Sequence, residues 1–242
     1  MAHFYLNELL GTPVVGGTVS LTGQEARHAV TVSRLAVGEE VSIGNGIGDI
    51  ARGSITVATH TELTIEVASV ESEERGTPAI VLAQALAKGD RDELAIQAAT
   101  ELGVDAVIPW TAARSISRWE GPKITKGHER WSAVVREATK QSIRSWIPDV
   151  LDLVSTKQLA KLAGSTRMLV LDPTATESLT AIELDDRDLV LVVGPEGGVS
   201  PAELDLLVAA GASAVRLGAT VLRTSTAGPA AIAVLNAKLG RW

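Results

Sequence analysis

A buried strand that runs straight into a glycine-rich loop constrains this 242-residue chain more than any other feature. The stretch LVLVVGPEGGVSPAEL begins at Leu189 with five aliphatic residues, followed by Gly-Pro-Glu-Gly-Gly and the start of a helix. Ser200 at the N-cap, Pro201 in the first turn and Glu203 three residues after the cap predict a capping box. The glycine loop, residues 194–198, is therefore expected at the carboxyl end of a buried strand, where open α/β sheets bind ligands.

The glycine loop matches neither of the common phosphate-binding patterns. It is not G-x-G-x-x-G and no P-loop lysine follows it, which argues against the usual dinucleotide and nucleoside triphosphate sites. Pro195 also removes one N–H from any phosphate cradle. Glycine lets the main chain approach a ligand closely and adopt positive φ. A generic phosphate loop and a merely tight structural turn remain as alternatives.

The first seventy or so residues have the pattern of a small β-barrel. In GSITVATHTELTIEVASVE, apolar residues alternate at Ile55 and Val57 and again from Leu63, the period expected of half-buried strands. Asn-Gly at positions 45–46 is a hairpin signal. One helix interrupts this region, with Thr22 as its predicted cap and Glu25 as the capping-box partner. Short strands, tight turns and a single helix favour a barrel.

The remainder of the chain alternates strands and helices. AIVLAQAL and VDAVIPW read as buried strands, and the helix between them is predicted to begin at a cap on Asp90, with Glu93 at the third position, and to end at Gly103. A helix over about 127–144 and the strands MLVLD and DLVLVV follow. This order predicts a parallel α/β sheet with helices on both faces. We expect a barrel at 1–72, a linker at 73–78 and an α/β domain at 79–242.

Charge and tryptophan are unevenly distributed. The net charge is −7, yet residues 110–147 hold eight basic and only three acidic side chains, together with four of the five tryptophans. Cations neutralise phosphates and aromatic rings stack on unpaired bases, so this segment is compatible with RNA binding. The alternative is a solvated amphipathic helix whose tryptophans pack in the core.

Residue types also limit the chemistry. Cysteine is absent and the four histidines are scattered, so we expect no disulfide and no metal site, in keeping with a cytoplasmic location. No apolar run reaches the roughly 18 residues of a membrane span, and the chain starts with no secretory pattern. We therefore expect no membrane association.

A second glycine-bearing stretch supports a family resemblance. LVVGPEGGVSPAEL followed by LGATVLRTSTA resembles the paired signature of the SPOUT methyltransferases, and more closely that of the RsmE-type 16S rRNA uracil-N3 methyltransferases. GDRDELAIQAATELGVDAVIPW, RSISRW and ERWSAVVREATKQS resemble the family's central block in order and spacing. LTGQEARHAVTVSRLAVGEEV resembles its N-terminal domain. The resemblance therefore extends over most of the chain.

This resemblance implies a PUA-like N-terminal barrel and a C-terminal SPOUT domain tied in a trefoil knot, a rare topology. It implies S-adenosylmethionine as cofactor, a homodimer, and 16S rRNA of the small ribosomal subunit as partner, in the cytoplasm. The cofactor-binding residues that it implies are Leu171, Asp172, Gly194, Pro195, Glu196, Gly197, Gly198, Leu217, Gly218, Leu222, Arg223, Thr224 and Thr226. The residues expected to contact RNA are Arg27, Arg34, Arg114, Arg118, Trp119, Arg136 and Arg144.

Two residues are candidates for the chemistry. Uracil N3 is a poor nucleophile while protonated, so a site must remove that proton or stabilise the anion. Arg223 is the candidate for positioning the base or stabilising its charge, and Glu196 is the candidate base. As alternatives, Glu196 holds the glycine loop closed, and Arg223 binds a phosphate or pairs across a dimer.

The chain departs from the family pattern at two places. The usual Gln-Ser-Gly-Arg reads QSIR from Gln141, so this helix end or an RNA contact is expected to differ. Pro229 stands near the start of the last helix, which predicts a late start, at Thr226 or beyond. That apolar helix is expected at a two-fold interface or, alternatively, buried in its own subunit. Three rival functions remain open: a ribose 2′-O-methyltransferase, a non-catalytic RNA-binding assembly factor, and a metabolic nucleotide-binding enzyme.

Overall fold

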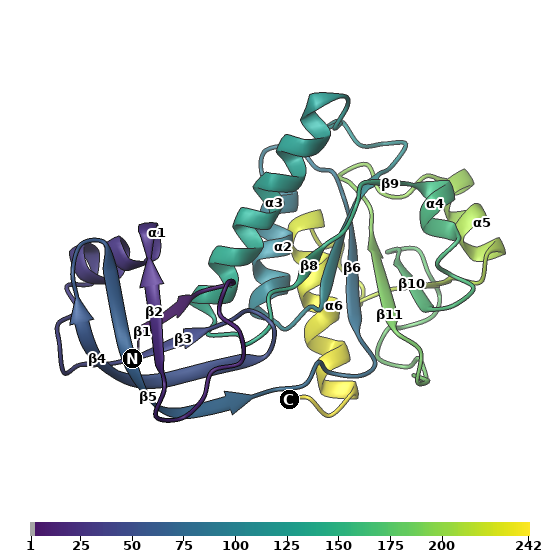
Figure 1. Cartoon of the computed structure of the whole chain (residues 1–242). Helices are drawn as coiled ribbons and strands as arrows, with labels where there is room; N and C mark the ends of the chain where they lie inside the picture. The colour runs from purple at the N-terminus through teal and green to yellow at the C-terminus, as the bar shows by residue number, and fades with distance from the viewer. Residues whose placement is uncertain (1–2) are drawn as a thin grey trace. The chain divides into compact units, whose positions relative to one another are not determined.

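The computed structural model describes residues 3–242, which form two compact units (Figure 1). The first unit takes in the described residues up to Arg75 together with Thr139–Ile147, and the second contains Gly76–Ala138 and Pro148–Trp242. Residues 139–147 are predicted from the sequence to belong to the second domain, whereas the structure groups them with the first. Trp146 Nε1 donates a hydrogen bond to the Glu73 carbonyl at 2.7 Å, and Ser145 Oγ donates to the Glu73 carboxylate.

A curled five-stranded sheet forms the first unit. The strand order is β1-β3-β4-β5-β2, and every pair is antiparallel except β1 with β3. A register shift between Ile55 and Val57 turns Val57 outward, so that Ile55 is buried while Val57 is exposed, and the predicted alternation fails at this point. The strands are β1 (His3–Leu6), β2 (Thr18–Thr22), β3 (Glu40–Gly44), β4 (Asp49–Ala58) and β5 (Glu62–Ser72).

A short helix α1 (Gly23–Arg27) continues into a single π-helical segment η1 (His28–Val32). Thr22 occupies the N-cap position, but its side chain makes no capping hydrogen bond. Thr22 is the last residue of β2, and the Glu25 carboxylate instead forms an ion pair with Lys140 at 3.0 Å. The predicted capping box is therefore wrong here, because a tertiary ion pair competes for the glutamate.

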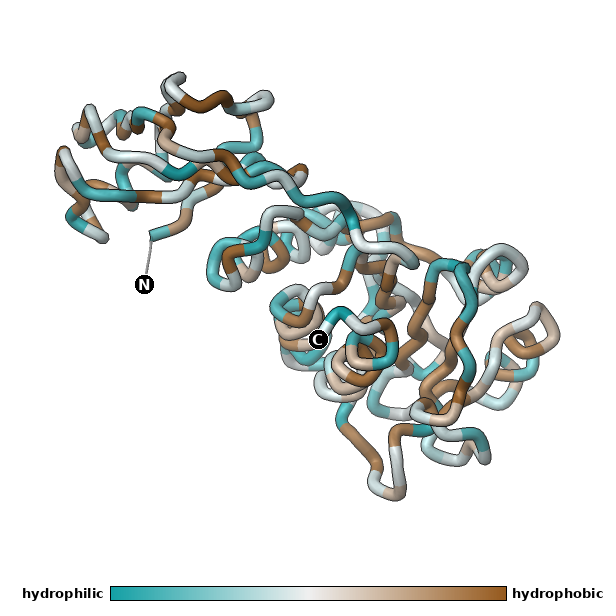
Figure 2. The backbone as a smooth tube through the Cα atoms, turned by 90° about the horizontal axis from the view of Figure 1, so that it is seen from below, coloured by the Kyte–Doolittle hydropathy of each residue, from teal (hydrophilic) through white to brown (hydrophobic). Residues whose placement is uncertain are grey.

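The second unit contains the predicted parallel sheet. Its strand order is β12-β10-β11-β6-β7-β8, with β9 pairing to β7, and every pair is parallel. In Figure 2 these strands are largely hydrophobic. The strands are β6 (Ile80–Ala85), β7 (Ala106–Thr111), β8 (Asp149–Val150), β9 (Val154–Ser155), β10 (Arg167–Leu171), β11 (Leu189–Val193) and β12 (Ser213–Val215).

Helices cover both faces of this sheet. The helices α2 and α6 contact each other and β6 on one face, and α4 and α5 contact each other on the opposite face (Figure 1). Leu159 of α4 and Leu207 of α5 pack in one buried cluster with Val170 and Val192 of the sheet. The helices are α2 (Arg91–Glu101), α3 (Pro122–Gln141), α4 (Thr156–Ala160), α5 (Pro201–Ala209) and α6 (Thr224–Lys238).

Helix ends follow the sequence signals in part. The capping box of α5 is confirmed, because Ser200 Oγ accepts the Glu203 N–H and the Glu203 carboxylate accepts the Ser200 N–H at 3.1 Å. Asp90 stands at the N-cap of α2 with φ +58° and makes no side-chain cap. Asp92 takes over this function and accepts hydrogen bonds from the N–H groups of Ala87 and Glu93.

The last helix starts earlier than predicted. α6 begins at Thr224, with Arg223 as its N-cap, although Pro229 lies inside it and cannot donate to the Ser225 carbonyl. Tertiary packing outweighs this loss, since Gly228 and Pro229 are buried and a Cβ at position 228 would come within 2.9 Å of Leu82. Its buried residues also pack inside the second unit, in agreement with the alternative to a two-fold interface.

The C-terminal end of α3 has a left-handed residue at Ile143, the position at which the resemblance implies glycine. Ile143 has φ +56°, and the Arg144 N–H reaches back to the Thr139 carbonyl at 3.1 Å, the bond of a Schellman-type helix end. A β-branched residue is strained there by about 1–2 kcal/mol. The backbone turn is thus formed here without a glycine.

We expect Ile143→Gly to raise the free energy of unfolding by about 1 kcal/mol, because relief of the strain exceeds the extra chain entropy that glycine brings to the unfolded state. Urea denaturation followed by circular dichroism measures the change. The matched variant Ile143→Val keeps both the β-branch and the strain and should not gain stability. Equal stability of the glycine variant and the parent chain would show that this turn carries no strain.

Candidate functional site

Three loops surround a cavity of about 790 Å³ in the second unit. They follow the adjacent strands β10, β11 and β12, whose carboxyl ends lie at one edge of the parallel sheet, the usual ligand position in this architecture. This volume is in the range of sites for small molecules, about 300–1,000 Å³. All of the residues predicted to bind cofactor line this cavity except Thr226, which is exposed within α6 and does not belong to its wall.

The glycine loop builds one wall from main chain. A Cβ on Gly194 would lie 2.8 Å from the Val199 nitrogen, so no side chain fits at this position. Gly198 has φ +71° and its N–H donates to the Pro195 carbonyl at 2.8 Å, which closes a tight turn. On the opposite loop Gly218 has φ +134°. Backbone N–H and C=O groups can therefore approach a ligand without intervening side chains.

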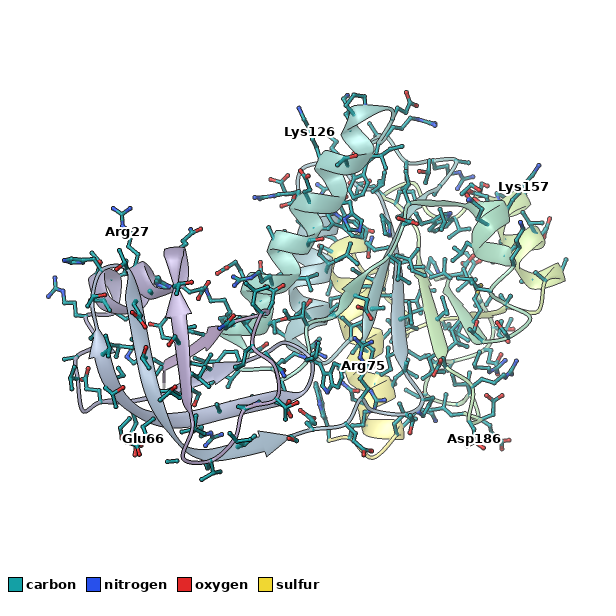
Figure 3. All side chains as sticks on the ribbon, in the orientation of Figure 1. Arg27, Glu66, Arg75, Lys126, Lys157 and Asp186 are labelled. Carbon is teal, nitrogen blue, oxygen red and sulfur yellow. The ribbon has the colours of Figure 1, made fainter. Side chains whose placement is uncertain are left out.

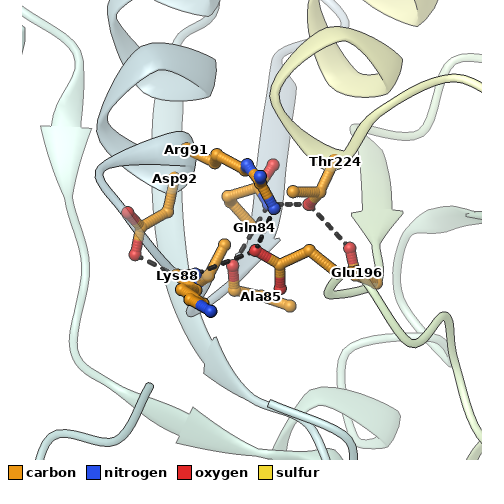
Figure 4. Close-up of polar contacts among 9 residues, drawn as sticks. Gln84, Ala85, Lys88, Arg91, Asp92, Glu196 and Thr224 are labelled. Carbon is orange, nitrogen blue, oxygen red and sulfur yellow. Dashed lines mark hydrogen bonds and ion pairs between the residues drawn. The ribbon is translucent and has the colours of Figure 1, made fainter. Parts of the chain in front are cut away.

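A buried threonine ties the glycine loop to the last helix. Thr224 Oγ1 donates to the Gly194 carbonyl at 2.7 Å and accepts from Gln84 Nε2 at 2.9 Å (Figure 4). Gln84 is fully buried in β6. The first turn of α6, the central strand and the glycine loop are thus held together by one side chain. Sequence reasoning missed Gln84, although a lone amide inside the apolar run AIVLAQAL was an available signal.

The Glu196 carboxylate is occupied by structural contacts. It accepts hydrogen bonds from the Lys88 N–H and from Arg91 Nη1, each at 3.0 Å (Figure 4). Burial acts to raise the pKa of this carboxyl group, but the N–H groups of Glu196 and Lys88 and the Arg91 guanidinium outweigh it, so the pKa lies below its ordinary value. A carboxylate of this kind is a weak proton acceptor, which favours the loop-closing role over the role of base.

Arg223 lies in a position suited to chemistry. It lines the cavity and is exposed, and its side chain makes no hydrogen bond or ion pair with any residue within 3–242. It is also the N-cap of α6, next to the anchored Thr224. Its guanidinium is therefore available for a ligand while its backbone is fixed.

Arg114 belongs to the cavity wall as well as to the basic segment. Its Nη1 donates to the Gly197 carbonyl at 2.8 Å, and a Cβ on Gly197 would come within 3.2 Å of its Cβ. Arg118, four residues later, is exposed and has no side-chain partner among the described residues. Of these two predicted RNA contacts, one also supports the glycine loop and the other faces solvent freely.

Most tryptophans of the basic segment are structural. Trp110 and Trp131 are buried, with exposed fractions of 0% and 1%, so the packing alternative is correct for them. Trp119 is half-buried, stacks edge-on against Trp131 at 5.3 Å and covers Gly127, where a Cβ would touch its ring. Trp146 lies in the first unit beneath the Arg75 guanidinium, 4.7 Å from the ring centroid.

The other predicted RNA contacts are distributed over both units. Arg27 and Arg34 are exposed in the first unit, and Figure 3 shows Arg27 extending into solvent. Arg136 bonds to its neighbour Glu137 at 3.2 Å, and Arg144 is half-buried after α3. No group of acidic and histidine side chains within 3–242 has a metal-binding arrangement. None of the helices in this part of the chain is long and apolar enough to cross a bilayer.

Two family models match this chain in the order of its two units. An RNA methyltransferase domain covers residues 74–236, and an RNA methyltransferase PUA domain covers residues 21–68. The chain belongs to the RNA methyltransferase family. The first match spans the parallel sheet and all three cavity loops, and the second covers most of the curled sheet.

Relatives in this family are similar over nearly the whole chain. The ribosomal RNA small subunit methyltransferase E of Mycobacterium bovis is 42% identical, with 99% of this chain and 92% of the relative covered. The protein of the same name from Bacillus subtilis is 32% identical over 87% and 86% of the two chains. A crystal structure of the ribosomal RNA small subunit methyltransferase E from Neisseria gonorrhoeae, bound to S-adenosyl methionine, superposes on this chain with a TM-score of 0.87. The two sequences are 28% identical, and the superposition covers 98% of each chain.

Family membership agrees with the fold predicted from the sequence. The N-terminal sheet with its PUA match and the parallel C-terminal sheet are both present. From β12 at one edge of the sheet, the chain returns across the ends of the strands to place Thr224 beside Gly194 and Gln84. A C-terminal knot requires a return crossing of this kind.

Proposed function

We propose that this chain transfers a methyl group from S-adenosylmethionine to N3 of a uracil in 16S rRNA of the small ribosomal subunit. The observation that carries the proposal is the cavity at the carboxyl ends of β10, β11 and β12, whose walls combine glycine-loop main chain, apolar side chains and charged side chains such as that of Arg223. Relatives that cover almost the whole chain are named as small-subunit rRNA methyltransferases, and one such structure contains S-adenosyl methionine. The specific base and atom come from the sequence resemblance.

The cavity residues fit a donor of this type. Gly194 leaves no room for a side chain, and Gly198 and Gly218 adopt positive φ, so the walls can offer N–H and C=O groups to an adenine edge. Leu171, Leu217 and Leu222 supply apolar surface at the same cavity. These residues would hold the donor, which supplies an electrophilic methyl group when bound.

Methyl transfer is an in-line displacement, and alignment is the protein's main contribution. When N3 loses its proton to solvent, the uracil ring carries the negative charge that makes N3 nucleophilic toward the methyl group that the donor would supply. Arg223 is the group that stabilises the developing negative charge on the base, because its guanidinium is free and faces the cavity. Glu196 keeps the glycine loop in place through Lys88 and Arg91.

The role of Glu196 gives a distinct prediction. Because its pKa is lowered, the group is ionised throughout the neutral range, and any stability that it contributes is lost only as the pH falls through that low pKa. The ion pair with Arg91 is partly exposed and is worth about 0–1 kcal/mol. We expect Glu196→Gln to retain turnover within roughly tenfold and to leave the pH–rate profile unchanged. Loss of the acidic limb of that profile would assign Glu196 as the base.

Arg118 and Arg114 should respond differently to truncation. Arg118→Ala removes a free cation and should weaken RNA binding and reduce the slope of log affinity against log salt by about 1, with cofactor affinity unchanged. Arg114→Ala also removes the bond to Gly197 and should weaken binding of both RNA and S-adenosylhomocysteine. Filter binding and calorimetry measure the two affinities. Equal behaviour of the variants would contradict this division.

The resemblance also supports a homodimer and a cytoplasmic location, where small ribosomal subunits are assembled. The test of the proposed function is incubation with labelled S-adenosylmethionine and small ribosomal subunits from cells that lack the protein, followed by mapping of the label. We expect one mark on N3 of a uracil. A mark on a ribose hydroxyl would indicate the 2′-O alternative. Absence of both transfer and cofactor uptake would leave only an RNA-binding role.

A further inference from the structure

A second cavity of about 330 Å³ adjoins the first within the same unit. It lies between the β6–α2 connection, the loop after β7 and the N-terminal half of α3. Two short segments serve both cavities. In one segment Lys88 lines the second cavity and Arg91, three residues later, lines the first. In the other segment Arg114 lines the first cavity and Ile116, two residues later, lines the second.

The ion pair of Arg91 with Glu196 marks the border between the two cavities. Glu196 and Arg91 line the first cavity, and the Lys88 N–H that bonds to Glu196 belongs to the wall of the second. Figure 4 shows the Glu196 side chain extending toward Lys88, with Thr224 on one side of the Glu196 carboxylate and Asp92 on the other. A base undergoing methylation must touch the donor in the first cavity. The second cavity is therefore placed for a neighbouring group of the substrate.

The side chains of the second cavity suit a nucleobase better than a phosphate. Its wall carries two cationic and three acidic side chains, which would not attract an anion. Ile116 is 72% exposed and, with Trp119, supplies apolar surface. The Lys88 ammonium and the Asp90 carboxylate make no hydrogen bond with any described residue, so one donor and one acceptor remain available.

The remaining charged groups of the wall, Asp92, Glu93 and Arg130, are paired within the protein. Glu93 is paired with Arg130 at 2.8 Å, and Asp92 accepts two backbone N–H groups. Among the charged side chains of the wall, Lys88 and Asp90 are therefore the two that can hydrogen-bond to a ligand. The edge of an unpaired base carries both carbonyl acceptors and N–H donors, and RNA modules read such edges beside apolar or aromatic surfaces.

We propose that this second cavity binds an unstacked base of the RNA substrate adjacent to the base that is methylated, with Lys88 donating to a carbonyl of that base, Asp90 accepting an N–H, and Ile116 covering its face. The inference rests on the proposed function. Occupation of this subsite fixes which nucleotide reaches the donor. It therefore acts on the affinity and selection of RNA, and not on the bond-forming step.

The test compares Lys88→Met and Ile116→Asn with Lys157→Met, a matched loss of one exposed cation on α4, whose side chain extends into solvent (Figure 3). Methyl transfer to small ribosomal subunits gives KM and kcat, binding of the same particles in the presence of S-adenosylhomocysteine gives Kd, and calorimetry gives the affinity for S-adenosylhomocysteine. We expect Lys88→Met and Ile116→Asn to raise KM and Kd for the particles roughly tenfold, with kcat and cofactor affinity unchanged. Lys157→Met should match the parent chain.

Two results would overturn the subsite. One is that both variants keep the parental KM and Kd, and the other is that cofactor affinity falls together with KM, which would make this wall part of the donor site. Absence of methyl transfer by the parent chain would instead contradict the proposed function. The particle-binding measurement stays informative in that case, because it does not depend on turnover.

Discussion

Gly194→Ala is expected to lower the affinity for S-adenosylhomocysteine by roughly tenfold to a hundredfold. The added methyl group would meet the Val199 nitrogen at 2.8 Å and the Gly198 carbonyl carbon at 3.0 Å, both of which are backbone atoms of the same loop. Backbone cannot rotate away as the end of a long side chain can. The loop must therefore open, which also displaces the Gly194 carbonyl from Thr224.

The matched control is Gly164→Ala, in an exposed turn of the same unit. A Cβ at position 164 meets no atom within 4 Å, and this glycine has no positive φ, so the control should bind S-adenosylhomocysteine like the parent chain. Calorimetry on both variants, with circular dichroism to verify folding, makes the comparison. Parental affinity in a folded Gly194→Ala variant would separate the glycine loop from cofactor binding.

Local patterns predicted the parts of this fold that depend on neighbouring residues in sequence. The capping box from Ser200 to Glu203 is confirmed because all of its bonds lie within one helical turn. The apolar run from Leu189 predicted a buried parallel strand because nothing in it competes with burial. The glycine loop predicted the cavity wall because glycines directly after a buried parallel strand allow the main chain to approach a ligand closely.

Features that depend on distant partners could not be predicted in this way. Glu25 has a capping pattern but pairs with Lys140, more than a hundred residues away. The bond between Gln84 and Thr224 spans 140 residues, so neither side chain alone indicates the other. The early start of α6 depends on the same long-range packing, which outweighs the local preference that Pro229 expresses.

The candidate site was predicted at the level of loops and less well at the level of individual side chains. Thr226 has the same chemical type as Thr224, yet helix geometry leaves it outside the cavity while Thr224 is buried under the glycine loop. Arg114 belongs to a basic segment that suggested RNA binding, and only the fold brings it to Gly197. The sequence therefore predicts which residue types occur at a site, whereas the role of each residue depends on where the fold places it.

Arg223→Ala is expected to lower kcat for methyl transfer by roughly a hundredfold to a thousandfold. The reason is electrostatic, because removal of a cation that faces developing negative charge raises the barrier while the ground state is little affected. The Arg223 side chain has no hydrogen-bond or ion-pair partner among the described residues, so its truncation should leave the structure of the loops intact. Affinity for S-adenosylhomocysteine should then change by less than tenfold.

Arg223→Lys and Arg187→Ala complete this comparison. Lysine keeps the charge but not the planar fork of donors, so kcat should recover only in part. Arg187 lies away from the cavity and bonds to Asp185 at 2.7 Å, so its truncation should leave kcat unchanged. Single-turnover measurements at saturating RNA isolate the chemical step. If Arg223→Ala raises KM for RNA and leaves the single-turnover rate at the parental value, Arg223 holds the RNA backbone and the anion on the base must be stabilised by another group.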